Sequence, residues 1–294
     1  MQKKVLVRFM ALLAIATSQK VPAQVTLSGN SYVQNFDALG GGLPTGWSVR
    51  TNATAVALGT SAAFATNSTS WGNTSGQFAN YASTLNSGTN LLGSESTAAQ
   101  SGFTNRGPGV RLTGSFGDPG AAFVLQLQNT LGFANFQLTL DLNMLSVQTR
   151  SNFWLIDYGL GSNPGSFVTV WTNADPGVFG TTTRTISFGD ALDNQAQNVW
   201  IRVVTLEAAA GTGSRDTFGI DNFKLDFSNA GALSPIPLNL QLFGTNAVLS
   251  WSNAAFTLES APSVNGAYTN IPGAGSPYTN PVAGPQRYFR LKAN

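Results

Sequence analysis

One carboxylate in this chain stands where an apolar side chain is expected. In the stretch DTFGIDNFKLDF, which runs from 216 to 227, strand periodicity places Asp221 in line with Phe223 and Phe227. An acid on the apolar face of a strand is costly unless a cation, an arginine or several N–H groups meet it. The sequence therefore predicts a specific partner for Asp221.

Few residues are available for acid–base or nucleophilic chemistry. The chain has no histidine and no cysteine, which excludes Ser-His-Asp and Cys-His catalysis, His- or Cys-based metal sites and disulfides. Retaining glycosidases need two carboxylates about 5 Å apart, but Glu95, Glu207 and Glu259 lie in no paired-carboxylate motif. Asp157 and Tyr158 are neighbours in an expected strand and so point to opposite faces. We therefore expect a protein that is not an enzyme.

Aromatic side chains offer a second kind of chemistry, which is sugar binding. Sugar rings pack their C–H faces against flat aromatic rings, while their hydroxyls bond to nearby polar groups. Trp71 lies in the polar tract TNSTSWGNTSG, without strand alternation around it, so we expect an exposed ligand-binding residue. Trp154 and Tyr158 share one face of an expected strand and form a second candidate platform, although strand tryptophans more often pack in a core.

The elements that must position these residues are strands. Helix signals are nearly absent, whereas β-branched and aromatic runs of period 2 recur between turns rich in Gly, Asn, Ser and Pro, so the chain is predicted to be all-β. The tract between the first expected strand and the second is rich in Ser, Thr, Asn, Ala and Gly, and we expect short strands and exposed loops there. The expected strands span 32–39, 109–113, 121–128, 136–147, 152–160, 167–172, 181–188, 199–206 and 217–227.

The first residues predict export. Lys3 and Lys4 precede a short apolar run, and Val21-Pro22-Ala23 follows it, which is typical of a signal peptide over 1–23 that is cleaved after Ala23. Four cations leave with this leader, so the chain's 15 Lys+Arg and 13 Asp+Glu become 11 − 13 = −2. No basic cluster remains, and no later apolar run reaches the ~18 residues of a membrane span. We expect a secreted, extracellular or cell-surface protein that binds no nucleic acid and does not insert into a membrane.

A small-residue joint after Phe227 predicts a domain boundary. The segment SNAGALSPIP contains two prolines and precedes four short alternating segments. We expect a first domain over 24–230, a linker over 231–236 and a small β module over 237–294.

Several stretches resemble a known family. FDALGGGLPTGWSV, RSNFWLIDYGLGSNPGSFVTV and DTFGIDNFKL are similar to the jelly-roll domain of secreted bacterial surface proteins, a fold that includes carbohydrate-binding modules and concanavalin-like lectins. The tail AVLSWSNAAFTLESAPSV resembles a fibronectin-type-III-like module found in exported proteins of the Verrucomicrobia and related phyla. The resemblance implies a jelly-roll β-sandwich followed by that module, with the first and last strands of the jelly roll side by side.

The implied neighbourhood suggests a metal site. If Asp37 and Asp221 approach each other, their carboxylates repel unless a cation lies between them or one takes a proton. Calcium takes hard oxygen ligands and needs neither His nor Cys, and Asn35 and Asn222 could add oxygens. Structural calcium at the joined terminal strands also occurs in many of the carbohydrate-binding jelly rolls that the chain resembles. The alternative is that Asp221 caps a backbone turn or pairs with an arginine such as Arg202.

Together these features favour an exported non-catalytic binding or adhesion protein that recognises polysaccharide or a cell-surface glycan and holds a structural Ca²⁺. Two alternatives stay open. One is a structural component of the cell surface or extracellular matrix that binds no sugar, and the other is a carboxylate-dependent glycoside hydrolase. The fold itself does not decide, because one fold hosts many functions.

Overall fold

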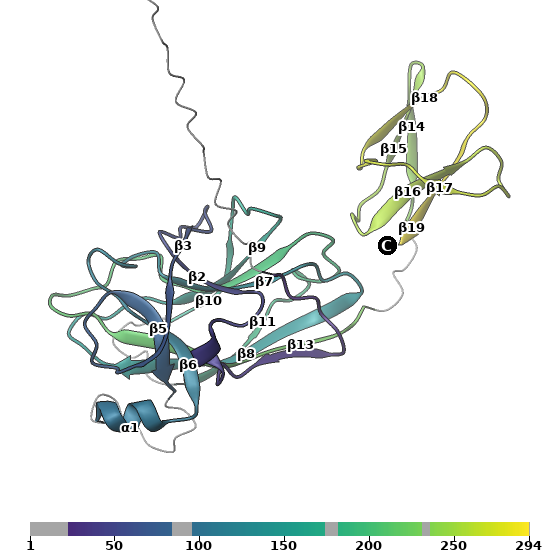
Figure 1. The fold of residues 1–294 in the computed structure, drawn as a ribbon. Helices are drawn as coiled ribbons and strands as arrows, with labels where there is room; N and C mark the ends of the chain where they lie inside the picture. The colour runs from purple at the N-terminus through teal and green to yellow at the C-terminus, as the bar shows by residue number, and fades with distance from the viewer. Residues whose placement is uncertain (1–22, 84–95, 174–181, 231–235, 294) are drawn as a thin grey trace, which may run out of the picture.

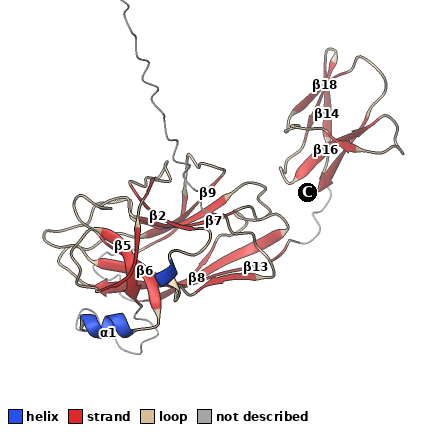
Figure 2. Ribbon diagram, in the orientation of Figure 1, coloured by secondary structure: helices blue, strands red, loops and turns tan. Residues whose placement is uncertain are grey.

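A computed structural model describes residues 23–83, 96–173, 182–230 and 236–293. All but the last residue of the predicted signal peptide, most of the predicted linker and Glu95 lie outside the described residues. The regular structure of the described chain is almost all strand, with one short α-helix and one 3-10 turn, and loops connect the strands (Figure 2). The predicted all-β sandwich fold class is confirmed.

The first of two large sheets has seven strands. Its order is β11-β8-β13-β6-β5-β4, and β1 also pairs with β13. All pairs are antiparallel except β4 with β5. The strands are β1 (Ser31–Gln34), β4 (Phe64–Thr69), β5 (Gln77–Ala82), β6 (Arg106–Arg111), β8 (Phe133–Ser146), β11 (Thr182–Ser187) and β13 (Thr217–Asn229). The first strand thus lies beside the last, as the family resemblance implied.

The second large sheet has six antiparallel strands in the order β10-β9-β12-β7-β2-β3. They are β2 (Trp47–Thr51), β3 (Thr60–Ser61), β7 (Ala122–Leu127), β9 (Leu155–Leu160), β10 (Val168–Thr172) and β12 (Val199–Val204). Figure 1 shows the two sheets as layers of one sandwich. Successive strands of the chain often change sheet, so segments far apart in sequence meet at each end.

Aromatic side chains fill the space between the two sheets. Trp154 stacks on Phe218, with 4.0 Å between ring centroids, and Phe123 lies 6.0 Å from Trp154 and 6.1 Å from Phe218. All three are almost fully buried. Because aromatic rings bury more apolar area than most side chains, such a cluster accounts for a large share of the sandwich's stability.

A second apolar cluster, separate from the core between the sheets, lies on the outer face of the seven-stranded sheet. Trp71, Tyr81 and Leu145 pack there in a separate apolar cluster, with the short helix α1 (Thr97–Gly102) nearby. The Ser/Thr-rich tract before β6 therefore does more than form the short strands and exposed loops that its composition predicts, because β5 is almost wholly buried. A 3-10 turn, η1 (Leu39–Gly41), follows β1.

A β-bulge in β13 changes which residues face the core. Asn222 has a left-handed φ of 47°, and the register with β8 shifts between Asp221 and Lys224. Core-facing residues are even-numbered before the bulge and odd-numbered after it: Phe218, Ile220, Phe223, Leu225 and Phe227. Asp221 therefore lies on the outer face of the sheet. The prediction that it shares the apolar face with Phe223 is wrong, because simple alternation cannot reveal an inserted residue.

Two three-stranded sheets form from residues 239–293. They have the orders β14-β15-β18 and β17-β16-β19. The strands are β14 (Asn239–Phe243), β15 (Asn246–Ser250), β16 (Phe256–Ala261), β17 (Thr269–Asn270), β18 (Tyr278–Pro281) and β19 (Tyr288–Ala293). Leu249, Trp251, Phe256 and Leu258 form their buried core. The likeness of this part to a fibronectin-type-III module stays a prediction.

Candidate functional site

Asp221 lies where β13 changes its neighbour. Before it, Gly219 pairs with Gly109 of β6, and after it Phe223 pairs with Gln34 of β1. On the other side of the strand, Asp221 lies directly opposite Asp141 of β8. A cross-strand pair brings two Cβ atoms to within about 5.5 Å of each other. The fold thus places two carboxylates together where β13 meets three other strands, β6, β1 and β8.

The Asp221 carboxylate is fully buried and only partly bonded. Its Oδ1 accepts the backbone N–H of Asn222 at 2.7 Å, and the Ser83 hydroxyl bonds to the same carboxyl group. Its Oδ2 is buried without a hydrogen-bond partner. Burial, together with the negative charges of Asp141 and Asp37, raises the pKa of Asp221 to about 7.

Asp141 is buried but well bonded. Its Oδ1 accepts the Thr183 hydroxyl at 2.6 Å, and its Oδ2 accepts the Asn222 side-chain amide at 2.8 Å. The bulge residue Asn222 thus contacts both acids, one through its backbone and one through its side chain. Sequence reasoning missed Asp141. Its alternation with the core residues Leu140 and Leu142 marks it as outward-facing, but pairing with Asp221 depends on a register that the sequence does not display.

Asp37 reaches this region from the turn after β1. The turn includes Phe36, which is buried in the core and has a left-handed φ of 57°. The Asp37 carboxylate accepts the Asn35 side-chain amide at 2.7 Å and the backbone N–H of Arg106 at 3.0 Å. Asn35 Oδ1 in turn accepts the Asp37 N–H at 3.3 Å. The structure therefore brings Asp37 close enough to Asp221 to raise its pKa, while Asn35 is occupied in its own turn.

The donor chemistry of this acidic junction partly fits a hard cation. Asp221 Oδ2 is an oxygen without a partner, and two further carboxylates lie near it. Calcium prefers carboxylate and carbonyl oxygens, usually six to eight of them. Within the described ranges, however, no three acidic side chains converge as a metal centre. Any ion held here would rely on Asp221, Asp37 and backbone or amide oxygens.

The two alternatives for Asp221 have different outcomes. Asp221 accepts one backbone N–H, that of Asn222 at the bulge within β13, and its role as a cap rather than a calcium ligand stays a prediction. Pairing with Arg202 is wrong. Arg202 instead forms a bidentate pair with Asp157, at 2.8 Å from Nε and 2.6 Å from Nη2. This pair is fully buried between β9 and β12, and Arg202 also donates to the carbonyls of Thr54 and Ala57.

The predicted aromatic platforms are mostly interior. Trp71 is only 1% exposed and donates its indole N–H to the Ala82 carbonyl, so the prediction of an exposed ligand-binding residue is wrong. The polar loop around it folds back over the outer face of the sheet. Trp154 is 0% exposed and lies in the sandwich core, so it offers no surface to a ligand. The face that it shares with Tyr158 is the inward one.

Two other strand aromatics lie nearer the surface. Tyr158 is half-buried, with its ring edge-on to Phe188 at 6.1 Å, and its predicted role in ligand binding stays a prediction. Trp171 is half-buried on the edge strand β10, and the Arg184 guanidinium lies 5.6 Å from its ring centroid. This cation–π pair closes the edge of the sandwich between β10 and β11.

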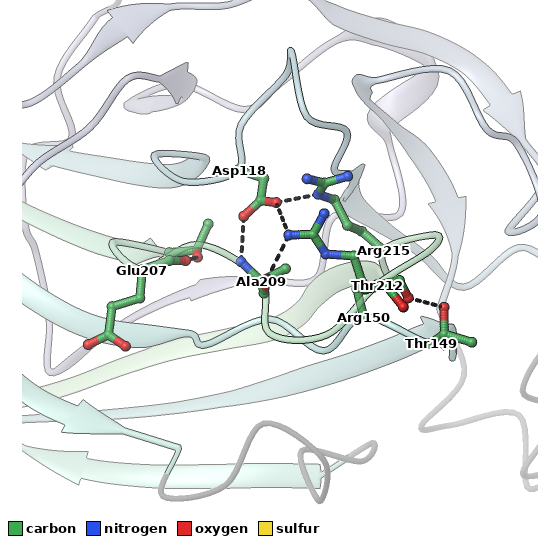
Figure 3. A network of polar contacts seen from close by, with 8 residues as sticks. Asp118, Thr149, Arg150, Glu207, Ala209, Thr212 and Arg215 are labelled. Carbon is green, nitrogen blue, oxygen red and sulfur yellow. Dashed lines mark hydrogen bonds and ion pairs between the residues drawn. The ribbon is translucent and has the colours of Figure 1, made fainter.

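One end of the sandwich carries a polar network that sequence reasoning missed (Figure 3). Asp118 accepts the Arg215 guanidinium and the backbone N–H of Ala209, and Arg150 lies 3.8 Å away through its Nη2. Arg150 Nη2 also donates to the Ala209 carbonyl at 2.8 Å. The three charged residues come from the loops β6–β7, β8–β9 and β12–β13, so no local pattern in the sequence connects them.

Comparisons with known proteins give similarity in fold only. No family model matches the chain, and no curated protein sequence matches it. A cyclase of the Stig type from Fischerella is 15% identical with a TM-score of 0.40, over 69% of this chain and 100% of that one. The K1 cleaved adhesin domain of Lys-gingipain from Porphyromonas gingivalis is 11% identical with a TM-score of 0.37, over 69% of this chain and 100% of the domain.

A third solved structure contains a carbohydrate-binding module. The CBM22-1–GH10 modules of a Clostridium thermocellum xylanase are 9% identical with a TM-score of 0.34, over 70% of this chain and 29% of theirs. Likenesses this weak do not bear on what the present chain binds. In the described part of the chain no helix is long and apolar enough to cross a membrane.

Proposed function

We propose that this chain is an exported, non-catalytic binding or adhesion protein that recognises polysaccharide or a cell-surface glycan. The proposal that the chain is not catalytic rests on one observation: its buried carboxylates are bonded to other parts of the fold. The side chains of Asp157, Asp118 and Asp141 are each buried and bonded to arginines, hydroxyls or amides of other strands and loops. Such acids hold strands together. A glycosidase needs instead a pair that is open to substrate.

The end of the sandwich that carries Asp118, Arg150 and Arg215 supports a binding role. Binding sites concentrate on loops that a rigid scaffold positions. Here four described loops meet at one end, because β2, β6, β8 and β12 all finish there. Polar and charged side chains from these loops, Arg150 and Arg215 among them, are available to the hydroxyl or acidic groups of a glycan.

We also propose that a calcium ion binds at the acidic junction and ties β13 to the turn after β1. Support comes from the unbonded Oδ2 of Asp221 and from the like charges of Asp37 and Asp141 around it. A cation would relieve their repulsion and supply the missing partner. In this role Asp221 and Asp37 would supply carboxylate oxygens, and the bulge at Asn222 would fix their approach.

The second candidate function is a structural surface protein that binds no sugar. The burial of Trp71 and Trp154 favours it, because it removes the two tryptophans on which sugar binding was predicted. The two functions differ in one measurable property, which is affinity for a glycan.

Affinity electrophoresis of the full mature chain tests the proposal. Native gels would contain neutral or acidic polysaccharides, and a non-binding protein of similar size would serve as the mobility reference. Retardation by at least one polysaccharide, without release of reducing sugar, is the expected result. Normal migration in every gel would instead support the structural alternative, and reducing sugar released in proportion to protein would support a hydrolase.

A further inference from the structure

Two arginines share a single carboxylate at the loop end of the sandwich. Both Arg150 and Arg215 form ion pairs with Asp118, through the same oxygen. The Asp118 side chain is 1% exposed, whereas those of Arg150 and Arg215 are 22% and 15% exposed. One carboxylate balances one guanidinium, so the network retains a positive charge. That charge is on the side chains that reach solvent.

The hydrogen-bonding capacity of this pair is only partly used. A guanidinium carries five N–H donors in a planar fork. Arg215 bonds to Asp118 through its Nε, which is one of these five donors. Arg150 uses Nη2 for the Ala209 carbonyl, and its Nε is buried without an acceptor. Asp118 therefore orients the two guanidinium groups without saturating them.

No other described acid neutralises the pair. The Glu207 side chain is exposed and points away from the two arginines in Figure 3. Asp216 follows Arg215 in sequence, but it is buried and faces Arg111 and the backbone N–H of Gln148. The positive charge at this end is therefore local and outward-facing.

The loop that carries Arg150 has further unused polar groups. Two residues along, Asn152 is fully buried, and neither its side-chain oxygen nor its nitrogen has a partner. Buried amides in folded proteins are almost always bonded. Thr149 and Thr212, which lie together beside the arginines in Figure 3, are exposed and joined by a hydrogen bond from the Thr149 hydroxyl to the Thr212 carbonyl at 2.8 Å. The β8–β9 and β12–β13 loops thus combine two oriented cations with exposed threonines suited to a hydroxyl-rich ligand.

We propose that Arg150 and Arg215 bind the acidic groups of an anionic polysaccharide, either a uronate carboxylate or a sulfate ester. This inference rests on the proposed glycan-binding function and names its ligand class. Arginine forks match planar carboxylates and tetrahedral oxyanions with two parallel hydrogen bonds, and these charge-assisted bonds are about twice as strong as neutral ones. A polysaccharide with a charge on every sugar unit would bind more tightly still, because several of its units can contact the arginines.

Isothermal titration calorimetry with soluble polymers tests the site. The full mature chain would be titrated with polygalacturonate, with dextran sulfate and with neutral dextran, in calcium-free buffer for the uronate arm. We expect measurable binding to at least one acidic polymer, weakened as salt rises from about 50 to about 200 mM. Whether the carboxylate or the sulfate polymer binds more tightly identifies the source of the anion.

Variants assign the binding to the two arginines. Arg150→Gln and Arg215→Gln should each lower the affinity by about tenfold or more, since each removes a charged donor. Lys224→Gln is the matched control, because it removes one exposed positive charge from within strand β13, and it should change affinity by less than about twofold. Arg150→Lys keeps the charge but not the fork and should give an intermediate affinity. Thermal melts identify any variant that has unfolded.

Three outcomes would overturn this inference. Binding to neutral dextran alone would leave glycan binding intact but refute the acidic ligand. Equal losses in Lys224→Gln and in the folded arginine variants, or equal binding to single-stranded DNA, would show attraction of any polyanion rather than a site. Failure of every polymer, neutral ones included, would refute the proposed function as well.

Discussion

Asp221 and Asp141 lie directly opposite each other on β13 and β8, both on the outer face of the seven-stranded sheet and both buried. The pair exists because the bulge at Asn222 turns Asp221 away from the core. Asp141 is satisfied by Thr183 and Asn222, and Asp221 is left with one unbonded oxygen. The calcium ion proposed above would supply the missing partner of the Asp221 carboxylate.

Calcium should stabilise the sandwich through Asp221. At a free concentration about 100 times the dissociation constant, an ion that binds only the folded state adds about 2.7 kcal/mol. For a domain of this size that corresponds to a rise in Tm of roughly 5–10 °C. Calorimetric melts with calcium and with EDTA would measure it.

The control for this effect is Asp221→Asn, which keeps the side-chain shape and removes the charge. The variant should fold and should melt at the same temperature with calcium and with EDTA. If EDTA leaves the Tm of the wild-type chain unchanged and Asp221→Asn is harmless, the proposed calcium site is wrong.

Asp216 should make stability depend on pH. Burial raises its pKa to about 6, against the hydrogen bond from the Gln148 N–H and the charge of Arg111. A carboxyl group whose folded pKa exceeds its unfolded value of about 3.9 stabilises the fold below pH 4, and this contribution is lost as pH rises to 6. The folded state therefore binds a proton on Asp216 more tightly than the unfolded state does.

Asp216→Asn isolates that dependence, because the amide oxygen can still accept the Gln148 N–H. Relative to wild type, the variant should gain up to about 3 kcal/mol between pH 4 and pH 7. Urea denaturation of both proteins at the two pH values measures the difference. If the variant and the wild type differed in unfolding free energy by the same amount at both pH values, the pKa of Asp216 would not be raised in the folded chain.

Breaking the buried Asp157–Arg202 pair should be costly. Arg202→Met leaves an unpaired carboxylate inside the sandwich, and such changes destabilise by about 3–5 kcal/mol. The guanidinium also lies 3.3 Å from the ring centroid of Phe167, and this contact would be lost as well. The double variant Asp157→Leu/Arg202→Met removes both charges and should recover much of the loss. Chemical denaturation would contradict this account if the single and double variants were equally stable.

Trp71 should act on stability rather than on ligand binding. Trp71→Ala removes a fully buried ring from the outer cluster and should cost about 3–5 kcal/mol. Trp71→Phe keeps most of the ring, loses the hydrogen bond to Ala82 and should cost about 1 kcal/mol. If folded Trp71→Phe lost glycan affinity while its Tm stayed near that of wild type, Trp71 would be a ligand contact after all.

Strand periodicity predicted most of the large sandwich. The expected strand 136–147 matches β8, and 199–206 matches β12, because their alternation is long and regular. The bulge at Asn222 was not predictable, since one left-handed residue shifts the phase of a strand without any change in composition. Trp71 was misjudged for a related reason: a polar, irregular loop can still bury its one large side chain when a sheet lies beneath it.

The candidate site was only partly predictable. The meeting of Asp37 with Asp221 followed from the family resemblance, which placed the first strand beside the last. The contacts of Asp221 with Asp141 and of Asp118 with Arg150 and Arg215 depend on register and on loops that meet at one end. These are three-dimensional relations between segments that are distant in sequence, and no spacing along the chain encodes them.

Binding of a polysaccharide without cleavage is the property that separates a binding protein from a hydrolase and from a structural protein. A polymer that retards the chain in a native gel would be incubated with it for a day, and its size distribution would then be measured by size-exclusion chromatography. We expect at least one polymer that retards the protein and keeps its size distribution after the incubation. If such a polymer became shorter, or if no polymer retarded the protein, the protein would not be a non-catalytic glycan binder.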